Sequence, residues 1–362
     1  MKSISFTVTN DLAQDQRMNR ICSSLHAAGF EVTLIGRTGG NSKPLLDKSF
    51  LQKRFYCFFE KGKLFYLEYN FRLFFVLLFS KQDAYCAIDF DSILPNYLVS
   101  KIKHKPLIYD AHEYFTELEE VVSRPVTKWV WETLERWIVP RVKYAYTVSK
   151  GYKKLFDGKY KTNFDIIRNA TVLRNFEVGG KPEKYILYQG SVNCGRGLEQ
   201  LVLAMKSVNC KLIICGDGDI LPQLKVLVNS NNLQAKVDFK GFVNPSELLE
   251  YTRNATIGIT LFSNTGLSNQ YSLANRFFDY MHACVPQLAM SYPEYKSFNL
   301  QWEIATLVED LESNSIEVAL KKLLTDKMYY EKLSANCKVA REVNCWQEEE
   351  AKLIEIYQKL FN

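Results

Sequence analysis

The chain has 362 residues, 47% of them hydrophobic and 24% charged, which is the composition of an ordinary globular protein. This length favours two domains, each large enough to bury its own core. The nine cysteines lack CxxC spacing and the four histidines are dispersed, which argues against a disulfide scaffold and a structural metal site. The first ten residues contain no apolar signal core, so we expect a cytoplasmic protein.

The net charge of +6 comes entirely from the first half of the chain. Residues 1–180 hold 27 Lys and Arg against 19 Asp and Glu, whereas the remainder holds 19 against 21. The apolar run FRLFFVLLF (71–79) lies in this basic half and is too short to span a bilayer, which needs about 20 residues. Two interpretations stay open: a buried helix, which we favour, and a surface that rests on an anionic membrane.

In the first half, runs of β-forming residues alternate with helical patterns. The first run leads into a helix that ends near Gly29. This alternation predicts a parallel sheet covered by helices. The expected strands are 3–8, 31–36, 84–88, 105–110, 145–149 and 164–169.

A polar stretch with Gly-Gly and Pro at 174–184 then predicts a linker. After it the strand pattern restarts, and the chain is helical from about Ser315 onward. We therefore expect two consecutive α/β units, with ligands at the carboxyl ends of their strands. The expected strands of the second unit are 184–190, 211–216, 236–242 and 255–262.

The stretch YQGSVNCGRGLEQLVLAM (188–205) reads as a strand, a glycine-rich loop and the start of a helix. Gly190 and Gly197 let the backbone approach an anion closely, and the helix start offers unpaired N–H groups. The side chain of Arg196 can hold a diphosphate through two parallel hydrogen bonds. The same pattern also fits a plain βα turn with a solvated arginine, so this stretch alone leaves both interpretations open.

Two acidic motifs follow expected strands of the first half. Asp89 and Asp91 could share a divalent cation, but acids after a strand also cap the next helix, and we favour capping. In IYDAHE (108–113), Asp110, His112 and Glu113 come at the carboxyl end of a strand. An imidazole beside carboxylates can transfer a proton or orient a hydroxyl, and the alternative is a cluster that caps and packs.

Two further motifs lie in the second half. GDGD (216–219) lacks the third glycine of a dinucleotide-binding loop, and its acids would repel a diphosphate. SLANRFFDYMHACVP (272–286) reads as a helix entered through Ser272 and ended by Pro286. Asn275 and Asp279 lie one turn apart on this helix, where a carboxylate could accept both ribose hydroxyls of a nucleotide. A solvated helix face is the alternative.

Taken in order, these motifs resemble the two-domain nucleotide-sugar glycosyltransferases of the GT-B type, and in particular the retaining family 4 enzymes of bacterial polysaccharide and lipid-linked glycan synthesis. The likeness covers most of the chain and is best in the second half, through QGSVNCGRGLE, CGDGD, FKGFV and SLANRFFDYMHACVP. It implies two Rossmann-like domains facing across a cleft. Residues 1–174 would bind the acceptor, 175–344 would bind the nucleotide sugar, and the helix at 345–362 would return to the first domain.

The resemblance also implies roles for individual residues. The catalytic residues would be His112, which orients the donor sugar, and Arg196. The implied donor-binding residues are Gly190, Ser191, Arg196, Gly197, Phe242, Val243, Ser272, Leu273, Asn275 and Asp279. The acceptor-side residues would be Asp15, Arg17, Asp91 and Glu113. Neither a metal nor a cofactor is implied, and the donor would be a UDP- or GDP-sugar.

The chain departs from this family at two places. Tyr271 and Asp279 occupy the positions of two glutamates that many members place eight residues apart. The glycine-rich loop has one arginine where many members have two basic residues, and Ser191 takes the earlier place.

The resemblance therefore implies a retaining, metal-independent glycosyltransferase. It would transfer a sugar to a lipid-linked glycan in bacterial surface polysaccharide synthesis. Its partners would be the nucleotide sugar and the glycan acceptor, with no nucleic acid. Peripheral binding to the inner face of the plasma membrane, through the N-terminal domain, is an interpretation that stays open. The alternatives are a nucleotide-sugar epimerase of the same fold and a non-catalytic partner subunit.

Overall fold

The computed structural model describes residues 1–13, 15–40, 42–175 and 183–361. The chain divides into two compact units, Met1–Arg168 with Glu349–Asn362, and Asn169–Glu348. Most of the linker predicted at 174–184 lies outside the described residues, which exclude 176–182. The C-terminal segment thus belongs to the same unit as the N-terminal sheet.

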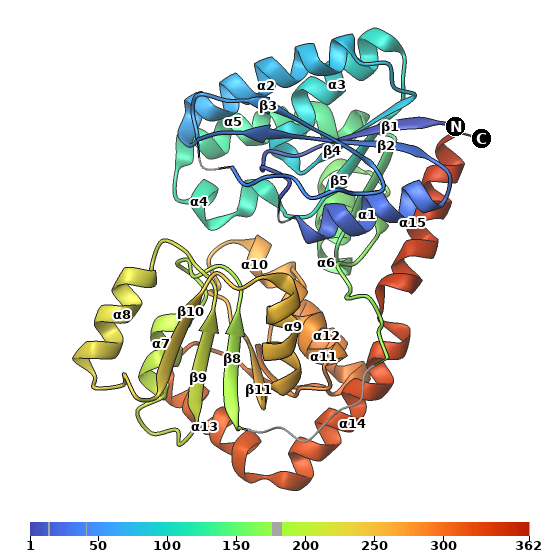
Figure 1. Ribbon diagram of the computed structural model, residues 1–362. Coiled ribbons are helices and arrows are strands. Elements are labelled where there is room, and N and C mark those ends of the chain that lie inside the picture. Colours follow the sequence, from blue (N-terminus) through green and yellow to red (C-terminus); the bar gives the residue numbers. More distant parts are fainter. Residues whose placement is uncertain (14, 41, 176–182, 362) are drawn as a thin grey trace. The chain divides into compact units, whose positions relative to one another are not determined.

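The first unit contains a sheet of seven parallel strands in its described residues, in the order β3-β2-β1-β4-β5-β6-β7 (Figure 1). The strands are β1 (Ser3–Thr7), β2 (Glu31–Thr38), β3 (Leu51–Tyr56), β4 (Ala84–Ile88), β5 (Leu107–Ala111), β6 (Tyr144–Thr147) and β7 (Asp165–Ile166). The central strands are buried over their whole length, as expected for a sheet with helices on both faces.

Figure 1 shows α2 and α3 on one side of this sheet and α1 and α15 on the other. The α-helices are α1 (Gln16–Ala27), α2 (Gly62–Phe79), α3 (Ile93–Lys103), α4 (Glu119–Val122), α5 (Pro125–Ile138) and α6 (Lys150–Tyr160). Short 3₁₀ turns are η1 (Phe90–Ser92), η2 (Phe115–Glu117) and η3 (Val139–Arg141).

The last helix, α15 (Trp346–Phe361), packs on the first unit through its aromatic side. Tyr357 is fully buried, and its ring centroid lies 5.8 Å from that of Phe6 in β1. Its hydroxyl lies 3.2 Å from that of Tyr146 in β6. Near the start of the helix, the buried Glu349 forms an ion pair of 2.7 Å with Arg168 and accepts the Arg168 backbone N–H. These contacts anchor both ends of α15.

The second unit contains six parallel strands in its described residues, in the order β10-β9-β8-β11-β12-β13. They are β8 (Tyr185–Gln189), β9 (Lys211–Cys215), β10 (Val237–Gly241), β11 (Ile257–Thr260), β12 (Gln287–Met290) and β13 (Ala305–Val308). The helices are α7 (Leu198–Ala204), α8 (Leu221–Ser230), α9 (Pro245–Asn254), α10 (Leu267–Tyr271), α11 (Asn275–His282), α12 (Pro293–Trp302), α13 (Ser313–Thr325) and α14 (Lys327–Val343). Two parallel α/β sheets confirm the predicted fold class.

Three predictions about elements need correction. The strands β3, β12 and β13 were not predicted. The helix predicted over 272–286 begins at Asn275, because Ser272 is extended and Ala274 donates its N–H to the Tyr295 hydroxyl at 3.1 Å. The run 71–79 is helical, but the buried-helix interpretation is wrong for its outer side, where Phe71, Phe75 and Phe79 are exposed. Within the described part of the chain, none of the helices has both the length and the apolar character needed to cross a membrane.

Candidate functional site

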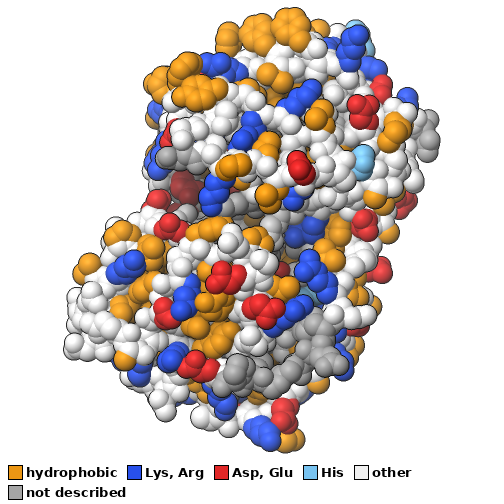
Figure 2. Space-filling model, in the orientation of Figure 1, with side chains coloured by type: hydrophobic (Ala, Val, Ile, Leu, Met, Phe, Trp, Pro, Cys, Tyr) orange, Lys and Arg blue, Asp and Glu red, His pale blue; other side chains and the backbone are white. Residues whose placement is uncertain are grey.

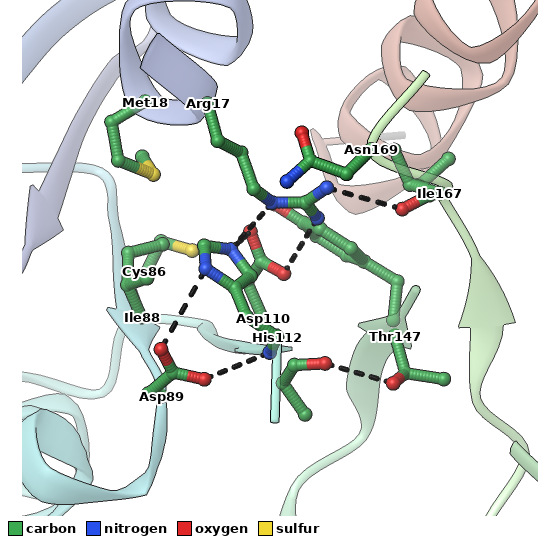
Figure 3. Close-up of polar contacts among 12 residues, drawn as sticks. Arg17, Met18, Cys86, Ile88, Asp89, Asp110, His112, Thr147, Ile167 and Asn169 are labelled. Atoms are coloured by element: carbon green, nitrogen blue, oxygen red, sulfur yellow. Dashed lines mark hydrogen bonds and ion pairs between the residues drawn. The ribbon is translucent and has the colours of Figure 1, made fainter. Parts of the chain in front are cut away.

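A buried polar cluster lies at the carboxyl ends of β4 and β5 in the first unit (Figure 3). Its centre is Arg17, on the first turn of α1 and only 4% exposed. Arg17 donates from Nε to Nε2 of His112 at 2.6 Å and from Nη2 to Oδ1 of Asp110 at 3.1 Å. Its third contact is Nη1 to the carbonyl oxygen of Ile167 at 3.3 Å. Sequence reasoning named Arg17 and His112, and the structure brings them into direct contact.

The neighbours of His112 determine its protonation state. Its Nε2 atom lies 2.6 Å from Nε of Arg17 and 2.8 Å from Oδ2 of Asp110, so both groups compete for this atom. Its Nδ1 atom lies 3.6 Å from the carboxylate of Asp89. Burial and the positive charge of Arg17 lower the pKa of His112, although Asp110 opposes that shift. His112 is therefore a neutral imidazole with a fixed orientation.

The carboxylates around His112 differ in their pKa values. Burial alone would raise the pKa of Asp110, but Arg17 and His112 outweigh that cost and lower it. Burial raises the pKa of Asp91 to about 7, although its Oδ2 atom accepts a hydrogen bond of 2.8 Å from Thr9. Burial, Glu113 and Asp91 together raise the pKa of Asp89. Carboxyl groups with lowered and with raised pKa values thus lie close together, as in many sites that handle protons or hydroxyls.

The helix-capping interpretation of Asp89 and Asp91 is wrong, because no side-chain cap is formed at η1 or at α3. Asp89 instead accepts the backbone N–H groups of His112 and Glu113 at 2.8 and 3.2 Å, so it orders the loop after β5. Asp15 caps α1 by accepting the Met18 N–H at 2.9 Å. Among the described residues there is no cluster of three or more His, Cys, Asp or Glu that could hold a metal ion.

The glycine-rich loop of the second unit connects β8 to α7. Gly190 has φ +129°, and a Cβ atom there would lie 2.9 Å from Nη1 of Arg276. Gly197 has φ +64° and directly precedes α7, so the loop is built on conformations that favour glycine. The GDGD turn supports the loop from one side, since Val192 donates its N–H to the Asp217 carbonyl at 2.9 Å. That turn is therefore part of the loop's scaffold.

Two guanidinium groups share one aromatic ring at this loop. The Arg196 Cζ atom lies 4.9 Å from the ring centroid of Phe262, and the Arg276 Cζ atom lies 4.6 Å from the same centroid. Arg276 is 8% exposed and donates to the carbonyls of Gln189 and Leu261 at 3.1 and 3.4 Å. Arg276 lies within the helix predicted over 272–286, but the sequence analysis did not assign it to the site. The available signal was an arginine three residues before Asp279 on that helix.

Asp279, predicted to bind ribose, lies on α11 close to the end of β8. Its Oδ1 atom accepts from the Thr171 hydroxyl at 2.6 Å and its Oδ2 atom from Gln189 Nε2 at 3.0 Å. Asn275, one turn earlier, accepts a hydrogen bond from Asn169. Gln189 was not predicted as a site residue. Its Oε1 atom accepts a hydrogen bond of 2.7 Å from the Thr252 hydroxyl, which fixes the amide that donates to the Asp279 carboxylate.

The remaining predicted donor residues lie at the same end of the second sheet. Phe242 and Val243 follow β10, where Phe242 is half exposed and Val243 packs on the core. Ser272 and Leu273 lie in the extended segment between α10 and α11, with Leu273 buried. The structure thus gathers the predicted donor residues around β8, β10 and α11 within one unit. Among the predicted acceptor-side residues, Arg17 donates a hydrogen bond to His112, and the backbone N–H of Glu113 donates to Asp89.

Comparisons with known proteins agree with this architecture. Residues 172–340 match the model of the glycosyl transferases group 1 family. An uncharacterized glycosyltransferase of Methanocaldococcus jannaschii is 32% identical over 112 residues, which is 29% of each protein. Sucrose-phosphate synthase of Thermosynechococcus elongatus has a TM-score of 0.83 at 16% identity, with 100% of this chain and 99% of that chain covered.

A further solved structure, Anabaena HepE in complex with UDP-glucose, has a TM-score of 0.80 at 13% identity and covers 99% of this chain and 100% of that one. At such identities the two structures establish the fold of this chain, whereas the family match covers most of its second unit. Residues 172–340 therefore form a glycosyl transferases group 1 domain within a chain of the GT-B fold.

Proposed function

We propose that this protein is a retaining glycosyltransferase that moves a sugar from a nucleotide diphosphate donor to a glycan. The observation that carries the proposal is the glycine-rich loop with two guanidinium groups on the Phe262 ring, inside the group 1 domain. Arginine and glycine-rich backbone together suit a diphosphate. The UDP-glucose bound to HepE, a protein of the same fold, supports a nucleotide-sugar donor.

In the proposed reaction the bond between the sugar and the diphosphate breaks, and negative charge grows on the leaving diphosphate. Arg196, Ser191 and the loop N–H groups would stabilise that charge, and Arg276 would add a fixed positive charge beneath the loop. Preorganised charge of this kind is usually the largest catalytic contribution. The leaving phosphate would accept the proton of the attacking hydroxyl, so no metal ion is required. Asp279 would hold the ribose and His112 would orient the donor sugar.

We further propose that the acceptor is a lipid-linked glycan of a bacterial surface polysaccharide and that the protein works at the inner face of the plasma membrane. The excess of positive charge in residues 1–180 supports this placement, because cytoplasmic membrane surfaces are anionic. Acceptor contacts would come from the first unit, through Asp15, Arg17, Asp91 and Glu113.

Thermal shift with UDP, GDP, ADP and CMP tests the donor site. A nucleotide at 100 times its dissociation constant stabilises the protein by about 2.7 kcal/mol, so the matching base should stand out. Arg196→Ala should then weaken binding of that nucleoside diphosphate by about 2–4 kcal/mol and change monophosphate binding less. Lys225→Ala, at an exposed position of α8, is the matched control. The proposal fails if no nucleotide shifts the melting temperature.

A transfer assay with the matching nucleotide sugar separates an enzyme from a non-catalytic partner subunit, the second candidate. The reason to consider that candidate is Tyr271, which occupies the place of a glutamate in the family that the sequence resembles. Sugar transfer or donor hydrolysis excludes the second candidate. Activity should survive EDTA, and a loss restored by Mg²⁺ or Mn²⁺ would refute the metal-independent mechanism.

A further inference from the structure

The outer side of α2 carries a continuous row of large apolar side chains. Leu64, Leu67, Phe71, Phe75 and Phe79 recur every three or four residues and are all exposed, Phe79 to 81%. The rings of Phe71 and Phe75 lie 5.1 Å apart, and those of Phe75 and Phe79 lie 6.4 Å apart. We call these five residues the α2 stripe.

The α2 stripe is not needed to hold the helix in place. The opposite side of α2 buries Phe65, Tyr69, Leu73 and Leu77 against the first unit, and the Tyr69 hydroxyl donates to the Val8 carbonyl at 2.6 Å. A surface helix normally has one apolar and one polar side. Since contiguous apolar patches are uncommon on soluble proteins, the second apolar side of α2 indicates a surface that meets something apolar.

Positive charge surrounds the α2 stripe. Residues 61–81 and 93–105, which contain α2 and α3, hold seven Lys and Arg and a single acid, Glu68. Glu68 is already engaged by Arg72 at 2.7 Å and by the Phe58 and Phe59 N–H groups. Lys103 of α3 donates to the Leu77 carbonyl at 3.2 Å, which fixes a cation at the end of α2. Figure 2 shows hydrophobic and basic side chains side by side over this part of the first unit.

Helix α5 also contacts α2 and α3 through its tryptophan rings. The ring of Trp131 packs edge-on against Tyr66 of α2 at 5.5 Å, and that of Trp137 against Tyr97 of α3 at 5.4 Å. On the same helix Trp129 is exposed. Tryptophan is enriched where proteins meet the interface between lipid and water.

We propose that α2 lies in the plane of an anionic lipid bilayer, with the α2 stripe in the headgroup region and the flanking lysines on lipid phosphates. A second copy of the chain is the less suitable occupant, because a two-fold contact would set the same cations against each other. Apolar side chains next to an excess of cations are the pattern of a helix bound at a membrane surface. The inference deepens the proposed function by naming its membrane surface, but its test does not depend on sugar transfer.

Co-sedimentation of the full chain with vesicles tests the proposal. The probes are phosphatidylcholine vesicles with and without 30 mol% phosphatidylglycerol, a composition of about one anionic lipid in three. We expect binding to the anionic vesicles only, and a strong decrease at high salt. The variant Phe71→Ser/Phe75→Ser/Phe79→Ser should bind at least about tenfold more weakly, because each side chain loses its apolar transfer energy. The charge variant Lys63→Glu/Lys81→Glu/Lys101→Glu should lose binding as well.

The control variant Leu300→Ser/Val318→Ser/Val339→Ser removes three exposed apolar residues of the second unit and should bind like the wild type. Equal melting temperatures of the variants exclude a folding defect. Unchanged binding of the triple phenylalanine variant, or an absence of wild-type binding to anionic vesicles, overturns the proposal. So does a concentration-dependent dimer that the phenylalanine variant abolishes, since the stripe would then be a protein interface.

Discussion

Replacement of Arg17 by methionine tests the polar cluster of the first unit most directly. The Arg17 and Asp110 side chains are 4% and 0% exposed and lie 3.1 Å apart, so this ion pair is fully desolvated. Methionine keeps the apolar stem but leaves the Asp110 carboxylate buried without its cation. Breaking a buried pair in this way costs about 3–5 kcal/mol of unfolding free energy. Urea denaturation measures that cost.

Two controls define the result. Lys321→Met breaks the exposed pair of Lys321 with Glu317 at 2.7 Å and should cost less than about 1 kcal/mol. The double variant Arg17→Met/Asp110→Asn removes both charges and should be destabilised by less than the sum of the two single variants. The ion pair lowers the pKa of Asp110, so its contribution is present above about pH 4 and is lost as the pH falls through the lower folded pKa.

The same variant should change the titration of His112. Arg17 lowers the pKa of His112 and Asp110 raises it, so Arg17→Met should raise the pKa. The signal of the imidazole Cε1 proton can be followed by NMR, because the chain has only four histidines. A cost below about 1 kcal/mol together with an unchanged His112 pKa would refute the reasoning, since both depend on the guanidinium contacts.

Three further variants test individual groups. Asp279→Asn should weaken ribonucleotide binding more than binding of the 2′-deoxy analogue, and an equal loss would exclude ribose contact. Asp91→Asn should stabilise the fold more at pH 8 than at pH 5, because the buried carboxyl ionises only near pH 7 and its ionisation opposes folding. Burial lowers the pKa of His282 to about 4, so His282 should contribute a loss of about 3 kcal/mol of unfolding free energy between pH 6.5 and pH 4, and His282→Gln should remove that contribution.

Much of the fold could be predicted from the order of strands and helices. The buried strands β4, β8 and β9 show nearly continuous apolar runs because helices cover both faces of each sheet. The strands that were missed give weaker patterns. β12 and β13 are four residues long, and β3 is an edge strand with Gln52, Lys53 and Arg54 in its middle. Such strands are specified by their neighbours in the sheet more than by their own composition.

The α2 helix shows a second limit of sequence reasoning. A helix that is apolar all round usually lies in a core, and nothing in residues 71–79 distinguishes the inner side from the outer. The distinction appears only in the structure, where the Tyr69 hydroxyl donates to the carbonyl of Val8, just after β1, and Phe71, Phe75 and Phe79 are exposed to solvent. Excess positive charge in the first half was the one sequence feature that pointed to a surface.

The glycine-rich loop could be located from its sequence, but the number of positive charges beside it could not be predicted. The sequence shows one arginine in the loop, and the structure adds Arg276 from a helix 80 residues further along the chain. Among the described residues no carboxylate forms an ion pair with Arg276, and a buried cation without an anion is costly. The two carbonyl oxygens and the two rings of Tyr188 and Phe262 offset part of that cost. In the proposed donor site a diphosphate on the loop would neutralise the remaining positive charge, and Arg276 would take the role of the second basic residue that the loop itself lacks.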